Sequence, residues 1–397
     1  MLLLDASHTS HTRAQTGIQR VTRSLFAELA LTQPTAGVCY DPGLRAWRTL
    51  NAGELDHLRP DQPATKSRGS KWSLRQRLAS HTRRLLGFVP ALPAATGFVC
   101  PEIFSPKVAA NLPAIFARVR GPRVAIFCDA IALQYPELTP PATVARFPAY
   151  LRELLAFDGV AAISETSAEI LRAYWRWLGV AAPPVVRALP LGLAKCHIIS
   201  DTSPGLRPPR LLCVSTVEGR KNHLALLEAC EKLWAEGLAF ELELIGLARA
   251  DTAAPALAKI AALRRAGLPL FYVGSVPEAE LHAAYGRCAF TVYPSLTEGF
   301  GLPVFESLGY GKPCVCSAHG ALGEAARGGG DKCGSLGGCV ALDRVDAPSL
   351  AAAIRRLLEN PAELAALAAA ARARPFRTWR DYAADLTGWM SKLPRRS

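Results

Sequence analysis

The sequence has no apolar run long enough to cross a membrane. Its longer uninterrupted apolar stretches, such as residues 159–163 and 211–214, fall far short of the roughly 20 residues that a membrane-spanning helix needs. The first residues carry no basic side chain and reach Asp5 after three leucines, so we expect a first strand there and not a secretory signal peptide. These absences favour a chain that works in the cytoplasm.

The 11 cysteines do not have the spacing of a metal site or of a disulfide framework. Their number is odd, no CxxC pair occurs, and most of them have apolar neighbours. Cys333 and Cys339 flank a glycine-rich stretch, which is the single place where zinc is worth considering. We expect the cysteines to be small core residues and expect no metal.

The sequence also has no internal repeat of 20 to 50 residues, which argues against a solenoid or a propeller. At roughly 100 to 200 residues per domain, 397 residues predict two to four domains. Half of the residues are apolar and 20% are charged, so a disordered chain is excluded.

Strands and helices are expected to alternate along two stretches of the chain, separated by turn-forming residues at 200–209. The expected strands are residues 2–5, 123–127 and 159–163, then 211–215, 240–245, 270–273, 290–293 and 314–316. The expected helices are 17–31, 151–156 and 164–177, then 223–236, 257–266, 278–285, 303–310, 347–358 and 361–373. This alternation predicts an α/β protein with two doubly wound parallel sheets. Such sheets bind ligands at the carboxyl ends of their strands, so a cleft between the two sheets is the expected site.

Acidic residues are missing from a strongly basic segment of the first half. Residues 1–200 contain 23 Lys and Arg against 13 Asp and Glu, whereas residues 201–397 contain 23 against 20. Seven of the basic residues lie within residues 66–84, interleaved with leucines and Trp72. A basic amphipathic helix over residues 66–88 that contacts an anionic membrane surface is one interpretation. A solvated loop is the second, and nucleic-acid binding, which no motif supports, is the third.

A glycine-rich turn between an expected strand and an expected helix is the strongest local feature. Gly299 and Gly301 let the backbone approach a ligand, and Pro303 suits the first turn of the helix. The N–H groups at such a helix start bind anions. Glu298 and Glu306 can then contact different parts of one polar ligand, although glycines before a helix are also explained by a tight turn.

A second turn of this kind, residues 214–223, places two cations before a helix. Asn222 is a suitable N-cap residue, and Arg220 and Lys221 precede it. Their charges add to the positive end of the helix dipole, which costs stability. A bound anion such as a diphosphate would offset that cost; a solvated pair of cations is the alternative.

These residues resemble the family 4 glycosyltransferases of the GT-B architecture, over nearly the whole chain. The turn at Arg220 and Lys221 is similar to the family's phosphate-binding turn, and Glu298 with Glu306 is similar to its Glu-x7-Glu motif. In the first half, Gly17 resembles the glycine loop below the donor phosphates. Residues 162–167, 189–192, 311–317 and 324 fit further parts of the pattern.

The resemblance implies a fold of two Rossmann-like domains: residues 1–200 on the acceptor side, and residues 201–374 binding the nucleotide sugar. Residues 375–397 would pack back on the first domain. The donor would be a GDP or UDP sugar, transferred with retention of configuration and without cofactor or essential metal.

The resemblance also implies residue roles. Arg220 and Lys221 would hold the diphosphate, Glu298 the donor sugar and Glu306 the ribose, while Val276 would line the base pocket. Gly17 would let a backbone amide approach the phosphates. The amides beside the donor sugar would be those of Gly299, Phe300, Gly301 and Leu302.

The sequence departs from the family pattern after the strand at 123–127, where Cys128 stands in place of the usual histidine. Asp129 then becomes the candidate polar group, and a candidate base, on the acceptor side; a capping or loop role is equally open. His8, His11 and Arg13 precede the glycine loop and are candidates for the acceptor or for plain surface roles. His319 either lines the cleft or caps a turn.

We therefore expect a hexosyltransferase, for example of mannose, that acts on a saccharide or polyprenyl-linked acceptor in bacterial surface glycan synthesis. It would work in the cytoplasm or on the inner face of the membrane, with no nucleic-acid partner. A soluble transferase for a small metabolite and an inactive GT-B binding partner are the alternatives. Arg220, Lys221, Glu298 and Glu306 together argue against inactivity.

Overall fold

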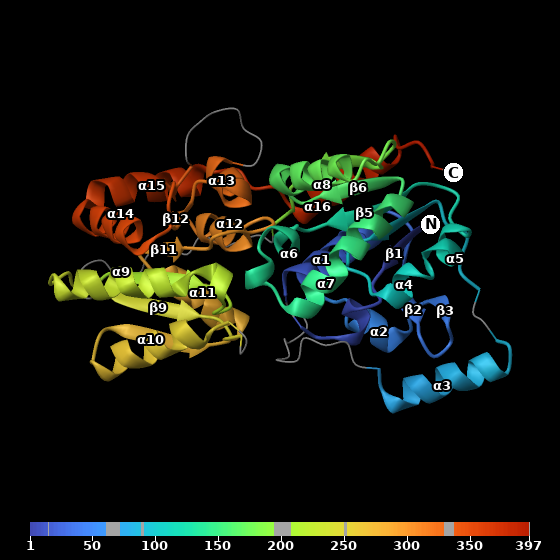
Figure 1. Cartoon of the computed structure of the whole chain (residues 1–397), viewed down its shortest axis with the longest axis horizontal. Helices are drawn as coiled ribbons and strands as arrows, with labels where there is room; N and C mark the ends of the chain where they lie inside the picture. The colour runs from blue at the N-terminus through green and yellow to red at the C-terminus, as the bar shows by residue number, and fades with distance from the viewer. Residues whose placement is uncertain are drawn as a thin grey trace. The chain divides into compact units, whose positions relative to one another are not determined.

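A computed structural model describes residues 1–14, 16–60, 72–88, 91–193, 208–249, 252–328 and 337–396. The chain forms two compact units (Figure 1). The first comprises Met1–Ala130, Ala142–Gly192 and Arg377–Ser397, and the second comprises Ile131–Pro141 and Leu193–Phe376. Most of the expected linker at 200–209 lies outside the described residues.

The first unit is built on a seven-stranded sheet with the order β3-β2-β1-β4-β5-β6-β7. Its strands are β1 (Leu2–Asp5), β2 (Thr35–Asp41), β3 (Ala46–Thr49), β4 (Gly97–Cys100), β5 (Arg123–Phe127), β6 (Gly159–Ala162) and β7 (Val185–Ala188). All neighbours pair in parallel except β2 and β3. The leucines of β1 are buried, as expected for a strand inside a sheet that is covered on both faces.

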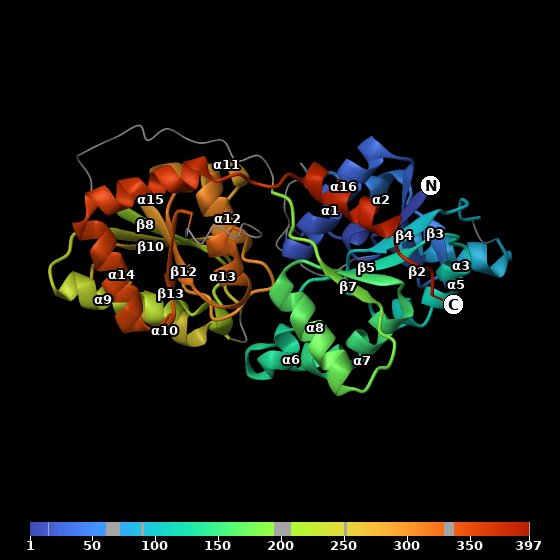
Figure 2. The same ribbon diagram turned by 90° about the horizontal axis from the view of Figure 1, so that it is seen from above.

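The helices of this unit include the last helix of the chain. They are α1 (Gly17–Thr32), α2 (Ala52–Asp56), α3 (Leu74–Leu85), α4 (Pro106–Ala109), α5 (Leu112–Phe116), α7 (Pro141–Glu153), α8 (Glu165–Trp177) and α16 (Trp379–Met390). A capping box between Thr378 and Asp381 starts α16, which packs on α1 (Figure 2). The predicted return of the C-terminal helix to the first domain is confirmed.

The second unit is built on a six-stranded parallel sheet with the order β10-β9-β8-β11-β12-β13. Its strands are β8 (Arg210–Val214), β9 (Glu241–Ile245), β10 (Leu270–Gly274), β11 (Phe290–Tyr293), β12 (Cys314–Ser317) and β13 (Cys339–Leu342). Its helices are α6 (Ile131–Gln134), α9 (His223–Ala235), α10 (Ala254–Arg265), α11 (Glu278–Arg287), α12 (Leu302–Gly309), α13 (Gly320–Arg327), α14 (Ala347–Glu359) and α15 (Pro361–Ala373). Two doubly wound units confirm the predicted fold class.

Alternating side chains of β8 fill the two sides of the second sheet. Leu211 and Cys213 join a large apolar cluster with α9, α10 and α14, whereas Leu212 joins a smaller one with Tyr285 of α11 and Tyr310. Burying both sides fixes the register of β8 and β11, and this register brings the loops that follow the two strands to one edge of the sheet.

The part of the chain from 45 to 95, which has no clear pattern in the sequence, contains β3, α2 and α3. Lys66, Arg68 and Lys71 lie outside the described residues. The described part of the chain contains no helix that is both long and apolar enough to cross a bilayer. Within the same residues, no group of three or more His, Cys, Asp or Glu side chains is arranged to hold a metal ion.

Candidate functional site

Two neighbouring loops of the second unit form the candidate site. The first follows β8 and contains a short 3-10 helix, Gly219–Lys221, that leads into α9. The second follows β11 and runs to the start of α12. The Leu296 N–H donates to the Arg220 carbonyl at 2.9 Å, and the Ser295 hydroxyl donates to the same oxygen at 3.2 Å. These bonds hold the two predicted turns together.

Glu298 accepts from both cations of the first loop. Its Oε2 lies 3.0 Å from Arg220 Nη1, and its Oε1 pairs with Lys221 Nζ. Tyr293 Oη and Ser295 Oγ donate to Oε1 at 2.8 and 2.6 Å. The side chains of Lys221 and Glu298 expose only 9 and 10% of their surface, so a solvated pair of cations, the alternative left open by the sequence, is wrong.

The ionisation of this cluster follows from its burial and its charges. Burial raises the pKa of Glu298, but Lys221 and Arg220 outweigh it and bring that pKa down to about 2. Burial lowers the pKa of Lys221 despite the attraction of Glu298. The pKa of Arg220 is raised, because Glu298 and Glu218 outweigh its burial. Glu298 is therefore ionised at neutral pH.

Glu218 adds a second acid to the outer side of the cluster. Its Oε1 lies 2.8 Å from Arg220 Nη2, and its Oε2 lies 3.5 Å from Arg249 Nη1. Glu218 and Glu298 thus contact Arg220 on two sides, and these ion pairs fix the orientation of its planar guanidinium. The anion that we expected beside the start of α9 is supplied, in part, by the chain's own Glu298.

Asn222 stands at the N-cap position of α9, but its side chain does not cap the helix. Its backbone is left-handed, with φ 55° and ψ 34°, and its amide donates to the Val345 carbonyl at 2.6 Å. The predicted N-cap position is confirmed, but the side chain does not make the capping bond that is usual for such a residue. The physical reason is that asparagine tolerates the left-handed region, where its amide is drawn to a carbonyl near β13.

The start of α12 has the form that an anion-binding helix end requires. Gly301 occupies the N-cap with φ 93°, Leu302 begins the helix and Pro303 follows. A Cβ on Gly301 would come within 2.9 Å of a Leu322 methyl, so both the backbone angle and the space require glycine. Phe300 of the loop stacks on Phe305 of α12, with ring centres 4.7 Å apart. Gly299 and Phe300 are buried.

Glu306 lies one turn into α12, on a different group of side chains from Glu298. The Tyr285 hydroxyl donates to Glu306 Oε2 at 3.3 Å, and Tyr285 stacks on Tyr310 with ring centres 4.5 Å apart. Val276 packs against the apolar cluster that contains both tyrosines. The structure therefore associates Glu306 with Val276, the two candidates for binding the nucleoside.

Two candidates belong to the first unit and are described within it. Asp129 follows the end of β5 and is half-buried, next to the buried Cys128. Burial, followed by the charge of Asp129, raises the pKa of the Cys128 thiol to about 12, so the thiol stays protonated. Gly17 is the exposed first residue of α1, and a Cβ there would meet nothing within 4 Å in the described chain.

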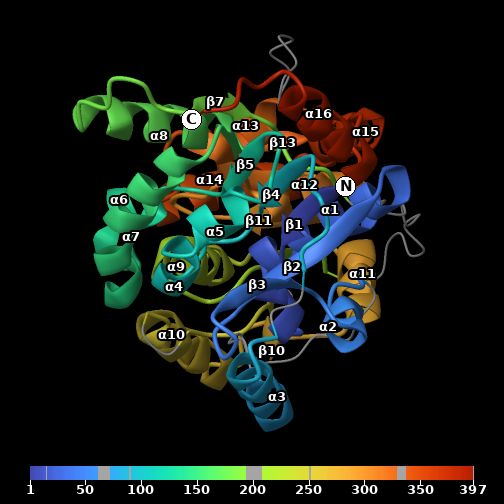
Figure 3. The same cartoon turned by 90° about the vertical axis from the view of Figure 1, so that its right-hand side faces the viewer.

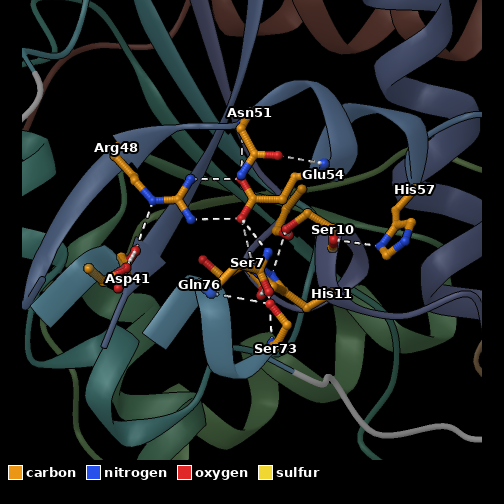
Figure 4. A network of polar contacts seen from close by, with 12 residues as sticks. Ser7, Ser10, His11, Asp41, Arg48, Asn51, Glu54, His57, Ser73 and Gln76 are labelled. Carbon is orange, nitrogen blue, oxygen red and sulfur yellow. Dashed lines mark hydrogen bonds and ion pairs between the residues drawn. The ribbon is translucent and has the colours of Figure 1, made fainter. Parts of the chain in front are cut away.

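The histidines that precede α1 differ in availability. His11 is buried, bonds Glu54 Oε1 through Nε2 at 3.0 Å and stacks on Trp72 at 3.8 Å, so a direct role toward an acceptor is wrong for His11 (Figure 4). His8 is half-buried and lies near Gln19, whereas Arg13 is exposed near Asp56. His319 occupies the N-cap position of α13 and bonds the Asp343 carbonyl at 3.1 Å.

The first unit contains a buried cluster of ion pairs around Arg48, Asp41 and Glu54, called the hub below, which the sequence did not predict. Arg48 of β3 bonds Asp41 Oδ2 at 2.9 Å and both oxygens of Glu54 at 2.7 Å (Figure 4). Glu54 is also the capping-box residue of α2, paired with Asn51. In the second unit, Tyr293, Ser295 and Tyr285 were missed in the same way, although the first two lie within the motif that contains Glu298.

Comparisons with known proteins find similarity to glycosyltransferases. Residues 199–374 match the sequence model of a family described as glycosyl transferases group 1. The serotype-specific mannosyltransferase WbdA of Escherichia coli is 25% identical over 331 residues, covering 77% of this chain and 37% of WbdA. The O-antigen chain mannosyltransferase B of Escherichia coli is 45% identical over 53 residues, covering 13% of this chain and 14% of that protein. The chain spans little more than a third of the length of WbdA.

Solved structures resemble the chain over nearly its whole length. Sucrose-phosphate synthase from Thermosynechococcus elongatus superposes with a TM-score of 0.65 at 18% identity, covering 98% of both chains. Anabaena HepE in complex with UDP superposes with a TM-score of 0.65 at 15% identity, covering 99% of both chains. At these identities the likeness establishes the fold.

Proposed function

We propose that this chain is a family 4 glycosyltransferase with the GT-B fold and that it transfers a hexose from a nucleotide diphosphate sugar to a saccharide acceptor. The observation that supports this most is the pairing of Arg220 and Lys221 with Glu298, inside the residues that the family model matches. The relatives named as mannosyltransferases favour mannose as the sugar and synthesis of a bacterial surface glycan as the setting.

The chemistry begins with the departure of the nucleotide diphosphate. As the bond between the anomeric carbon and the phosphate oxygen breaks, negative charge grows on the diphosphate. Arg220 and Lys221 neutralise this charge, and the first amides of α12 donate to it. Groups that are fixed before the reaction stabilise the transition state with little reorganisation, and Glu298 and Glu218 fix the two cations in the structure.

Retention of configuration is proposed to follow from attack on the face that the diphosphate leaves. The acceptor oxygen bonds to the anomeric carbon while the phosphate oxygen departs, and the acceptor proton passes to that departing oxygen. A covalent route would need a free carboxylate beside the anomeric carbon. Glu298 is paired with Lys221 and Arg220 and is therefore not free to act as a nucleophile. We propose instead that it accepts hydrogen bonds from hydroxyls of the sugar. The proposed reaction uses no metal and no cofactor.

The remaining roles are proposed from position and chemistry. Glu306 accepts bonds from the ribose hydroxyls, and Val276 contacts the base of a GDP or UDP donor. Gly17 leaves room for a backbone amide to approach the phosphates. Asp129 is the polar group offered to the acceptor in the first unit.

We place the acceptor on a membrane lipid of the polyprenyl type, at the cytoplasmic surface. This is supported by the excess of basic residues in the first half of the chain, which suits an acceptor held at an anionic surface. A soluble acceptor is the competing proposal, and the two are separated by comparing transfer to a short saccharide and to its lipid-linked form.

The donor is tested by a thermal shift and nucleotide release assay with UDP, GDP, ADP and TDP sugars. We expect one nucleotide series to raise the melting temperature, and its sugar to be released from the nucleotide when acceptor is added. Glu298→Gln is the matched variant, since it keeps the shape of the side chain and removes the counterion of Lys221. No response to any donor by either measurement would refute the transferase and leave a GT-B binding protein.

A further inference from the structure

Helix α3 turns its apolar side toward solvent. Leu74, Leu78 and Leu85 are spaced i, i+4 and i+11, so they form one stripe along the helix. They expose 76, 68 and 75% of their surface. Leu86 and Phe88 follow immediately and are also exposed. In a soluble protein the apolar stripe of a surface helix normally faces the core, and here it faces away.

The opposite side of α3 is attached to the first unit by polar contacts. Ser80, its one buried residue, donates to Asp41 Oδ2 at 2.7 Å. Gln76 donates to Glu54 Oε1 at 3.3 Å and also completes the capping box with Ser73. Figures 1 and 3 show α3 at the periphery of the unit. The helix is therefore fixed by its polar side, with its leucines pointing outward.

The helix carries four exposed arginines and no acid. At 100° per residue, Arg75 lies on one side of the stripe, and Arg77 and Arg84 lie on the other. Arg83, in the last turn with Arg84, lies on the opposite side of the helix from the stripe. An apolar stripe with cations on both sides is the arrangement of a helix that lies in the headgroup region of a membrane.

We propose that α3 binds an anionic lipid bilayer as an in-plane helix. Its leucines insert at the boundary of headgroups and acyl chains, and its arginines contact lipid phosphates. A second copy of the chain is disfavoured as occupant because stripe-to-stripe contact would bring the arginines of both copies together. Nucleic acid is disfavoured because its phosphates offer nothing to the central leucines.

The leucine side of α3 would be the surface that holds the chain at the membrane location proposed above, and in this respect the inference rests on the proposed function. It also relates the surface to the hub, because Asp41 and Glu54, which hold α3, bind Arg48, and Glu54 also binds His11. His11 belongs to the loop between β1 and α1. A membrane-bound α3 would therefore set the orientation of that loop and of the first unit relative to the bilayer.

The test is flotation of the full chain with vesicles, measured without donor or acceptor so that it stands apart from transfer activity. We expect binding to vesicles of equal parts phosphatidylglycerol and phosphatidylcholine, weak binding to phosphatidylcholine alone, and loss of binding at high salt. The variant with Leu74, Leu78 and Leu85 replaced by Ser should bind at least roughly tenfold more weakly. Arg75→Glu with Arg77→Glu should weaken binding by about 25-fold or more.

Matched controls keep the result specific to α3. Leu31→Ser on α1, where the leucine is 77% exposed, and Arg118→Glu with Arg120→Glu should leave binding unchanged. Equal binding to neutral and anionic vesicles, or equal losses in the control variants, would overturn the proposal. So would a dimer that the triple serine variant abolishes in the absence of vesicle binding, or preferential binding of an oligonucleotide.

Discussion

Each unit pairs arginine with carboxylates, but the centre of the cluster differs. In the first unit the buried Arg48 contacts two acids, whereas in the second unit Glu298 contacts two cations, one of which, Arg220, also pairs with Glu218. Arg48 bonds both Asp41 and Glu54. Glu298 bonds both Arg220 and Lys221. The first cluster joins β2, β3, α2 and α3, and the second joins the loops at the carboxyl ends of β8 and β11.

This difference distinguishes a structural cluster from one suited to a ligand. Arg48 donates hydrogen bonds to Asp41, Glu54 and the Thr49 carbonyl, which belong to several elements. Arg48 therefore stabilises the fold by joining these elements. Around Glu298, two cations and the starts of α9 and α12 bring positive charge to one place. Under the proposed function this place would receive a further anion, so the same residue types would perform different tasks.

The largest effect should come from breaking the hub of the first unit. Arg48→Met leaves two buried carboxylates without their partner, and we expect a loss of about 3–5 kcal/mol in the free energy of unfolding. The measurement is the urea midpoint followed by circular dichroism. Arg59→Met, at a residue whose side chain is 61% exposed, is the control and should change little. An unchanged midpoint in Arg48→Met would contradict the structural role.

The next effect should be on catalysis. Lys221→Ala removes a cation from the leaving group, and a loss of about 3 kcal/mol of transition-state stabilisation would lower turnover by roughly 100-fold or more. Lys259→Ala removes a lysine from a surface pair with Glu231 and should leave turnover intact. Turnover is measured as nucleotide release at saturating donor. Full activity in Lys221→Ala would remove this residue from the mechanism.

A smaller effect is expected at the nucleoside end of the site. Glu306→Gln keeps the size of the side chain and removes the charge that would accept bonds from the ribose, so we expect nucleotide affinity to fall about tenfold. Isothermal titration with the nucleoside diphosphate measures it, and Glu359→Gln, at an exposed position of α14, is the control. If both variants bind alike, Glu306 does not contact the ribose.

The smallest effect near neutral pH concerns ionisation, where the two clusters should agree. The pKa of Glu54 and that of Glu298 are both lowered to about 2, since Arg48 and His11 bond the former and Lys221 and Arg220 the latter, against their burial. A lowered folded pKa stabilises the protein above the unfolded pKa of about 4.5, and this stability is lost as the pH falls toward 2. Urea midpoints should therefore be insensitive to these groups from pH 7 to 5 and fall below. If the urea midpoint of Glu298→Gln falls less at low pH than that of the unchanged chain, the difference is the contribution of Glu298. An identical fall would contradict a lowered pKa of Glu298.

The sequence was sufficient to predict both turns of the second unit. Each turn joins a short apolar strand to a patterned helix, and parallel strands bring their carboxyl ends to one edge, which placed Arg220 near Glu298. The bonds from Tyr293 and Ser295 were not predictable, because they depend on the fold of the loop and not on the spacing. Asn222 shows the limit of local rules, since a carbonyl beyond β13 competes for its amide.

The first unit was harder to predict between residues 45 and 95. β3 has only four residues and carries the buried Arg48 beside Trp47, so it does not have the alternation of a half-buried strand. The charge of Arg48 is neutralised by Asp41 and Glu54. No local sequence pattern shows that these two acids lie close to Arg48. A helix in the basic segment was one of the three interpretations of the sequence, but the outward direction of its leucines depends on the contacts of Ser80 and Gln76.

Gly17 of the first unit is a position where substitutions can measure the distance between α1 and a bound ligand. Its backbone lies outside the left-handed region, and a methyl group there would meet no described atom within 4 Å. The fold alone would therefore accept alanine at this first position of α1, or even gain slightly from it. A series from alanine to valine to leucine would extend a probe of increasing length from a fixed point. If the donor binds beside Gly17 as proposed, the side chain at which donor affinity begins to fall would report how closely the donor approaches the helix.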